Sequence, residues 1–235
     1  MISIDEALDR LLHRASVLAG FLERGPAALE VSAEDAAALA VIDRAELART
    51  ARRVREEVLA RQHRGGGTLL TMFPRTIAAY PGGPWMLAEA FLESRAFDGH
   101  REVPFAGVGC SLEEAFYRFA EAAEIGAAEE REAEFLAAML RALAVNSRPD
   151  FVVPAEVRRA PAGFFAVGVR GEPTLFAALG GRFVTGAITP FLAELLVSDG
   201  RGEAVARRHG VADGVLAASL EHLAGLGLVA GATIV

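Results

Sequence analysis

Cys110, the only cysteine of the chain, lies between Gly107-x-Gly109 and a run of helix-forming residues. A thiol at the start of a helix can have a lowered pKa and act as a nucleophile, while glycines before a helix can hold a phosphate. A nucleophilic thiol needs a base, and no histidine is close to Cys110 in the sequence. Ser111 and Glu114 instead fit the Ser-x-x-Glu capping box. We therefore interpret Cys110 as a small apolar residue beside a helix cap, with a cysteine-dependent enzyme as an alternative.

The five histidines show none of the His-x-x-x-His or His-Glu spacings that are typical of metal sites; they are His13, His63, His100, His209 and His222. We interpret "FDGHRE" at 97–102 as an exposed polar loop, with partner contact as the alternative. The carboxylates of "AAEEREAEF" at 127–135 are predicted to lie on the wet face and in the first turn of a helix. The sequence thus predicts no catalytic residue, cofactor-binding residue or metal ligand in this chain.

Composition narrows the class of protein. With 235 residues, 52% of them hydrophobic, the chain can bury one large core or two ordinary ones. There is no run of about 18 uncharged apolar residues, and acids and arginines occupy the N-terminal stretch where a signal peptide has its apolar core. We therefore expect a cytoplasmic protein without a membrane span. The net charge is −7 and every basic residue is arginine, so nucleic-acid binding would need a local basic face.

The first 145 residues are predicted to be helical. Apolar residues recur every three or four positions over 2–24, which predicts one helix ended by Gly25-Pro26. Ser32 is predicted to cap the next helix, and the arginine-rich run to Arg61 continues it with a break near Asp43. Pro74 is predicted either to start or to kink a helix, and Pro84 to lie near the first position of another. Two more helices are predicted near 112–124 and 127–144.

The composition of the sequence changes after "NSRPD" at 146–150. Short β-rich pieces follow, punctuated by glycine and proline, namely "FVVPAEV", "GFFAVGV", "TLFAAL" and "RFVTGA". The last 45 or so residues are again helical and end in "LGLVAGATIV", which we predict as a closing strand. The predicted fold class is α+β, with an all-helical domain over 1–147 followed by a small winged-helix-like α/β module over 151–235.

A helix-turn-helix pattern lies within that module. Ala206, Gly210 and Leu216 occupy the small, turn and anchor positions of the motif. DNA recognition by its second helix needs cations for phosphates and guanines, yet the stretch from Asp213 to Leu223 contains no arginine. Residues 151–235 carry seven arginines against seven acids. We predict that the module has this fold without the DNA-binding function.

The order of motifs resembles a known family. "RRVREEVLARQHRGGGTLLTMFPRTIAAY", "LAEAFLESRAF" and "PFAGVGCSLEEAFYRFAE" are similar to the helical domain of the partner subunits of multinuclear iron-dependent peptide-modifying oxidases, the MbnC, TglI and HvfC type, once described as DNA-binding proteins. The C-terminal stretches "EVRRAP", "TLFAALGGRFVTGAITPFLAELLVSDG" and "LEHLAGLGLV" are similar in layout to the peptide-binding winged-helix modules (PqqD-like recognition elements) of ribosomal-peptide biosynthesis. The two resemblances together cover about residues 40–235.

The resemblance implies a noncatalytic accessory subunit. Iron and chemistry would then belong to a separate TIM-barrel oxidase, to which domain 1–147 binds as a heterodimer, while module 151–235 recruits a precursor peptide by its leader. A strand edge beside an apolar groove suits an extended peptide, so we predict peptide contacts at Val167, Val184, Leu216 and Leu220. Nucleic acid is not an expected partner. The alternative function is a winged-helix DNA-binding transcription regulator.

Overall fold

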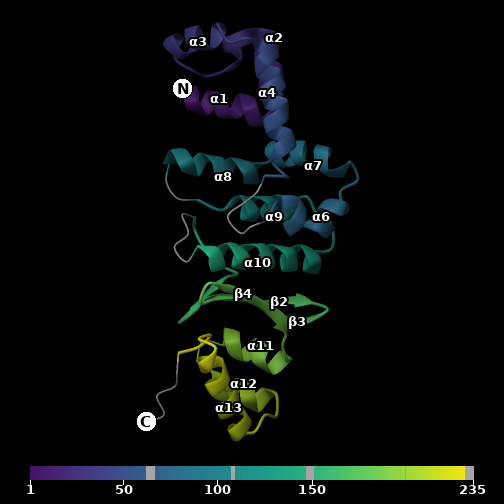
Figure 1. Cartoon of the computed structure of the whole chain (residues 1–235), viewed down its shortest axis with the longest axis vertical. Helices are drawn as coiled ribbons and strands as arrows, with labels where there is room; N and C mark the ends of the chain where they lie inside the picture. Colours follow the sequence, from purple (N-terminus) through teal and green to yellow (C-terminus); the bar gives the residue numbers. More distant parts are fainter. Residues whose placement is uncertain (62–66, 107–108, 147–150, 199, 231–235) are drawn as a thin grey trace.

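The computed structural model describes residues 1–61, 67–106, 109–146, 151–198 and 200–230, with side chains for all of these except 101–106. Figure 1 shows the elements stacked in layers along the long axis of the molecule. Helices form the first layers, one four-stranded antiparallel sheet follows, and three helices cover the far side of that sheet. The predicted α+β class is confirmed, with the sheet in the C-terminal part of the chain.

The N-terminal helices enclose a small core of their own. They are α1 (Ile4–His13), α2 (Ala15–Arg24), the 3-10 helix η1 (Gly25–Ala28), α3 (Ala33–Ala40) and α4 (Arg44–Glu57). Their buried side chains are Ala7, Leu11, Leu18, Phe21, Leu39, Leu47 and Ala51. The predicted cap at Ser32 is confirmed, because its hydroxyl accepts the amide of Asp35. The predicted break near Asp43 is also present, and there the Asp43 carboxylate accepts the amides of Ala45 and Glu46 and caps α4.

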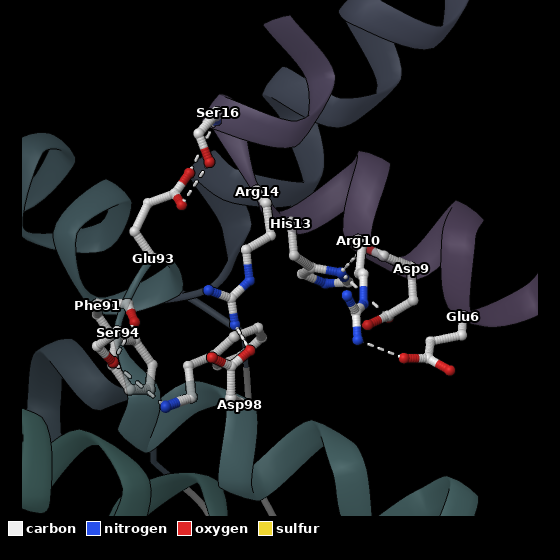
Figure 2. Close-up of polar contacts among 11 residues, drawn as sticks. Glu6, Asp9, Arg10, His13, Arg14, Ser16, Phe91, Glu93, Ser94 and Asp98 are labelled. Atoms are coloured by element: carbon white, nitrogen blue, oxygen red, sulfur yellow. Dashed lines mark hydrogen bonds and ion pairs between the residues drawn. The ribbon is translucent and has the colours of Figure 1, made fainter. Parts of the chain in front are cut away.

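The single helix predicted over 2–24 is wrong, because the chain leaves the helical conformation at Arg14. A second helix, α2, begins at the next residue, and a carboxylate from a distant part of the chain binds its first turn. Glu93 accepts hydrogen bonds from the backbone N–H of Ser16 at 2.9 Å and from the Ser16 hydroxyl at 2.7 Å. Arg14 turns away to form an ion pair with Asp98 (Figure 2). These contacts fix the N-terminal helices on the next layer and satisfy the amide that the break exposes.

The middle helices form the largest core. They are α5 (Leu69–Met72), α6 (Pro74–Ala78), α7 (Gly83–Leu92), α8 (Arg95–Ala106), α9 (Leu112–Ala122) and α10 (Ala128–Val145). Pro84 lies in the first turn of α7, as predicted, and of the two alternatives for Pro74 the structure shows the helix start, in the first turn of α6. The interpretation of 97–102 as a loop is wrong, because these residues belong to α8, where the Ser94 hydroxyl accepts the amide of Phe97.

The sheet contains β1 (Arg158–Ala160), β2 (Gly163–Arg170), β3 (Glu172–Leu179) and β4 (Arg182–Ala187), in the order β1-β2-β3-β4. Three of the predicted strands are therefore present. The predicted strand over 151–157 is absent, and Val152 instead donates its amide to the carbonyl of Gly109. The predicted closing strand is also absent over 226–230, and its remainder, 231–235, lies outside the described residues.

Helices cover both faces of the sheet. α10 packs on one face, where Gly168 of β2 lies so close that an added Cβ would approach Leu136 Cδ1 to 2.7 Å. The other face meets α11 (Pro190–Val197), α12 (Gly202–Arg208) and α13 (Asp213–Gly225). Phe164 and Phe176 of the sheet belong to the same buried cluster as the middle helices. That core thus runs across the predicted boundary, of which 147–150 lie outside the described residues.

Candidate functional site

The structure gives Cys110 an environment that disfavours the thiolate. Burial raises the pKa of the Cys110 thiol, and the neighbouring charge of Glu114 raises it further. His100, ten residues before Cys110, does come near it in the fold. Its Nδ1 lies 3.0 Å from the backbone carbonyl oxygen of Cys110. Of the Gly107-x-Gly109 stretch that was considered as a phosphate loop, residues 107–108 lie outside the described part of the chain. A raised thiol pKa lowers the fraction of thiolate, which is the nucleophilic form.

Ser111 caps α9, as its sequence position predicts. Its hydroxyl accepts the amide of Glu114 at 3.1 Å. The other half of the predicted capping box is not formed, because the Glu114 carboxylate faces Arg118 at 3.6 Å. The Ser111 hydroxyl also lies 3.3 Å from Met139 Sδ of α10, so the cap is buried between two helices.

Removing this cap is expected to destabilise the protein. Ser111→Ala deletes the hydroxyl that accepts the Glu114 amide, and losses of this kind lower the free energy of unfolding by about 0.5–2 kcal/mol. Cys110→Ala is the matched control, since it changes the neighbouring residue and leaves the cap. Urea unfolding of both variants decides the matter. Equal stability of Ser111→Ala and the parent would contradict the role of the cap.

Several carboxylates gather beside Arg118. Arg118 of α9 pairs with Glu114, Glu121 and Glu156, and Glu132 of α10 adds a further negative charge. Burial raises the pKa of Glu132, and nearby carboxylates raise it further. Within the described ranges, no group of three or more His, Cys, Asp or Glu side chains is arranged to hold a metal ion.

β4 is an outer strand of the sheet, and its outer edge has no partner strand among the described residues. Ile188 donates its amide to the carbonyl of Pro173 at 2.8 Å, and Ala187 lies opposite Thr174. Residue pairs in an antiparallel ladder alternate between bonded and non-bonded positions. Val184 therefore directs its N–H and C=O toward β3.

The register fixes which groups point outward from this edge. The neighbours of Val184, namely Phe183, Thr185 and Ala187, direct their N–H and C=O groups away from the sheet. No strand in the described part of the chain pairs with them. Such a row of unpaired donors and acceptors is a template for another extended chain.

The four residues predicted to contact a peptide divide between strands and helix. Val184 lies opposite Ala177, so its side chain is on the sheet face that α11–α13 cover, yet it is 51% exposed. Val167 lies on the same face in β2, partly buried. The N–H and C=O of Val167 point away from β3, toward the side of β2 on which β1 lies. The three-residue strand β1 pairs with β2 only as far as Phe165 and so does not reach Val167.

The two helical residues belong to the cluster on that face. Leu216 is buried in it and Leu220 packs against it from α13. All four predicted residues thus lie on one side of the sheet, with Val184 at an uncovered margin. The sequence did not single out Phe183, Thr185 and Ala187, because their outward orientation depends on strand order and register.

The helix pair predicted around Gly210 is present. α12 and α13 meet at a turn in which Gly210 has φ +63°, a conformation that favours glycine, and Ala206 and Leu216 are buried. Arg208 and His209 both contact Glu194 of α11, which neutralises charge beside the turn. The exposed face of α13 is mostly small, apolar or acidic, with the side chains of Asp213, Val215, Ala217, Ala218, Glu221 and His222.

Comparisons with protein-family models, with curated proteins and with solved structures found no match. The site must therefore be interpreted from its own chemistry. In the described part of the chain, no helix is long and apolar enough to cross a membrane. Two features of the described residues are candidates for a functional site. One is the unpaired outer edge of β4, beside which Val184 is exposed, and the other is the helix pair α12–α13, which has little positive charge.

Proposed function

We propose that this chain is a noncatalytic accessory subunit that recruits a ribosomally made precursor peptide to an iron-dependent TIM-barrel oxidase. In this proposal, the sheet with α11–α13 is a winged-helix-like recognition module, and the peptide binds as an extended strand. The observation that carries the proposal is the open outer edge of β4, with the apolar side chain of Val184 exposed beside it. The cytoplasm is the proposed compartment.

Peptide binding at this edge has a simple physical basis. An added strand gains main-chain hydrogen bonds from Phe183, Thr185 and Ala187 whatever its sequence, while alternate side chains fix its register. One set of those side chains would face Val184 and the cluster that includes Leu220. Main-chain pairing supplies affinity and the apolar face supplies selectivity.

The charge of the helix pair favours a peptide over DNA. Phosphate contacts need Lys or Arg at the surface that enters a groove, and the described part of α13 offers Asp213 and Glu221 with no arginine. Of the two arginines that end α12, Arg208 is paired with Glu194. That leaves Arg207 as the cation of this helix pair without an ion pair among the described residues.

The division of labour with an oxidase rests on the family resemblance and on the chemistry of this chain. Cys110 has a raised thiol pKa, and no His, Cys or carboxylate cluster suited to iron occurs among the described residues. In the proposal, iron is bound by the partner enzyme, which carries out the modification. This chain supplies recognition.

The proposal is tested by titrating the full chain with any short precursor peptide that is found encoded beside its gene and with duplex DNA, each at two salt concentrations. We expect saturable peptide binding with weak salt dependence, because main-chain pairing and apolar contacts dominate. Arg207→Ala should leave peptide binding unchanged. Duplex binding that falls steeply with salt and is lost in Arg207→Ala, without peptide binding, would instead favour the transcription regulator.

A further inference from the structure

The outer edge of β4 is bordered by positive charge, although the chain as a whole has a net charge of −7. Two stretches lie beside this edge, because α10 packs against β4 and β3 pairs with it. They are 135–146, from the middle of α10 to its C-cap, and 173–193, from β3 through β4 to the first half of α11. Their charged residues are Arg141 and Arg182, and neither stretch contains an acid.

The acids that flank these stretches in the sequence are engaged or placed elsewhere. Glu134, the last acid before Arg141, accepts two backbone amides at the start of α6. Glu194, the first acid after Arg182, pairs with two basic side chains at the C-terminal end of α12. Glu172 begins β3, at the other end of that strand from the hairpin that contains Arg182. Within the described residues, neither arginine forms an ion pair.

Phe183 of β4 holds the guanidinium of Arg141 beside the edge. The Cζ atom of Arg141 lies 5.0 Å from the centroid of the Phe183 ring, which is a cation–π contact between α10 and β4. This contact limits the positions of the guanidinium, while its N–H donors form no hydrogen bond to a described residue. Arg141 is also exposed. Its donors are therefore available to an anion that approaches the edge.

A strand added at β4 would bring one of its side chains to Arg141. The N–H and C=O of Phe183 point outward, so one residue of the added strand pairs with Phe183, and its Cβ lies about 5 Å from the Cβ of Phe183. Both side chains are then on the face of the sheet where Arg141 contacts the ring. The adjacent residue of the added strand lies on the other face, opposite Val184, whose side chain is 51% exposed.

We propose that the peptide bound at β4 carries an acidic residue opposite Phe183, whose carboxylate binds the guanidinium of Arg141, and an apolar residue beside it, opposite Val184. A carboxylate at the first position accepts charge-assisted hydrogen bonds, and Arg182 adds positive charge at the same end of the strand. Main-chain pairing alone accepts many sequences, so Arg141 makes the edge selective. The inference rests on the proposed function and names the class of peptide that this edge selects.

Two capped peptides test this selectivity on the full chain. They are acetyl-Ser-Thr-Val-Glu-Val-Thr-Ser-amide and its twin with glutamine in place of glutamate, which has the same shape and no charge. In both peptides, alternation along the strand puts the valines on one face and the glutamate or glutamine on the other. Titrations followed by the amide signals of Phe183 and Thr185 in nuclear magnetic resonance spectra give the dissociation constants. We expect the glutamate peptide to bind about threefold to fivefold more tightly than its twin, as for a well-placed exposed ion pair.

Substitutions identify the arginine that is responsible. Arg141→Gln should lower the affinity for the glutamate peptide to that for its twin and leave the affinity for the twin unchanged, and Arg141→Lys should keep part of the preference. The matched control is Arg53→Gln, which removes an exposed arginine of α4, in a layer remote from the sheet (Figure 1), with the same change in net charge. It should leave both affinities unchanged. Thr185→Pro should weaken both peptides alike, because it acts on main-chain pairing.

The outcomes separate this inference from the proposed function. Equal affinities for the two peptides, or a preference for glutamate that Arg141→Gln leaves intact, would overturn the inference while peptide binding at β4 stands. No saturable shift of the Phe183 and Thr185 amides with either peptide at millimolar concentration would overturn both, because main-chain pairing at an unpaired edge accepts a generic extended strand.

Discussion

Phe176→Ala is expected to lower the free energy of unfolding by about 3–5 kcal/mol, a large part of the stability of an ordinary domain. Phe176 of β3 is 3% exposed and belongs to the cluster that joins the sheet to the middle helices. Its removal leaves a cavity between β2, where Gly168 lies against the Phe176 ring, and α10. The close approach at Gly168 limits how far the two layers can collapse into that cavity.

The shared core makes a second, more specific prediction. Trp85 lies in α7, away from the sheet, so its fluorescence reports on the helical part. We expect Phe176→Ala to shift the urea midpoint of Trp85 fluorescence and of far-ultraviolet circular dichroism together. Val184→Ala, on the other face at the exposed edge, should change stability by about 0.5 kcal/mol or less. A Trp85 midpoint that stays unchanged in Phe176→Ala would show two parts that unfold independently.

Thr185→Pro is expected to weaken precursor-peptide binding by about tenfold or more, because proline removes an outward donor and places its ring at the pairing edge. Thr185 is exposed, and its amide is not used by β3. The fold should therefore tolerate the change. Thr185→Val is the matched control, since it keeps the backbone N–H and alters only the side chain.

Two other prolines sharpen this test. Val184→Pro removes a donor that the register directs at β3, so it should lower stability rather than report on the peptide. Val167→Pro removes an outward donor on the open stretch of β2 beyond β1. Binding that is lost in Val167→Pro and kept in Thr185→Pro would contradict the assignment to β4 and place the peptide at β2. Binding isotherms and unfolding curves of the three variants are compared with the parent.

Local signals in the sequence predicted the helix starts well. Ser32, Asp43 and Ser111 each cap a helix through their own side chains, and such caps depend on neighbours within three residues. The strands of the central β-rich segment were likewise predicted from their composition, except β1. These features require no knowledge of the rest of the chain.

The errors arose where distant residues decide the conformation. The break at Arg14 depends on Glu93 and Asp98, which are far away in sequence. The segment over 97–102 contains Gly99, which weakens a helix, yet Ser94 caps it and α9 packs against it. Tertiary contacts overrode local propensity in both cases.

The candidate site was predictable only in part. Val167, Val184, Leu216 and Leu220 do share one side of the sheet, because alternation along strands and the helix-turn-helix spacing are visible in sequence. The open edge itself is not visible, since it depends on strand order and on which residues occupy bonded pairs. The position of Arg141 beside this edge also escaped prediction, because α10 and β4 meet only in the folded chain.

Residue-resolved amide hydrogen exchange of β4, with and without the precursor peptide, tests the central claim most directly. The account predicts that the amides of Phe183, Thr185 and Ala187 exchange readily in the free chain and become protected on binding, because they gain acceptors from the added strand. The amide of Val184, which the register directs at β3, should be protected in both states. Saturating peptide that leaves Phe183, Thr185 and Ala187 unprotected would contradict peptide recognition at this edge.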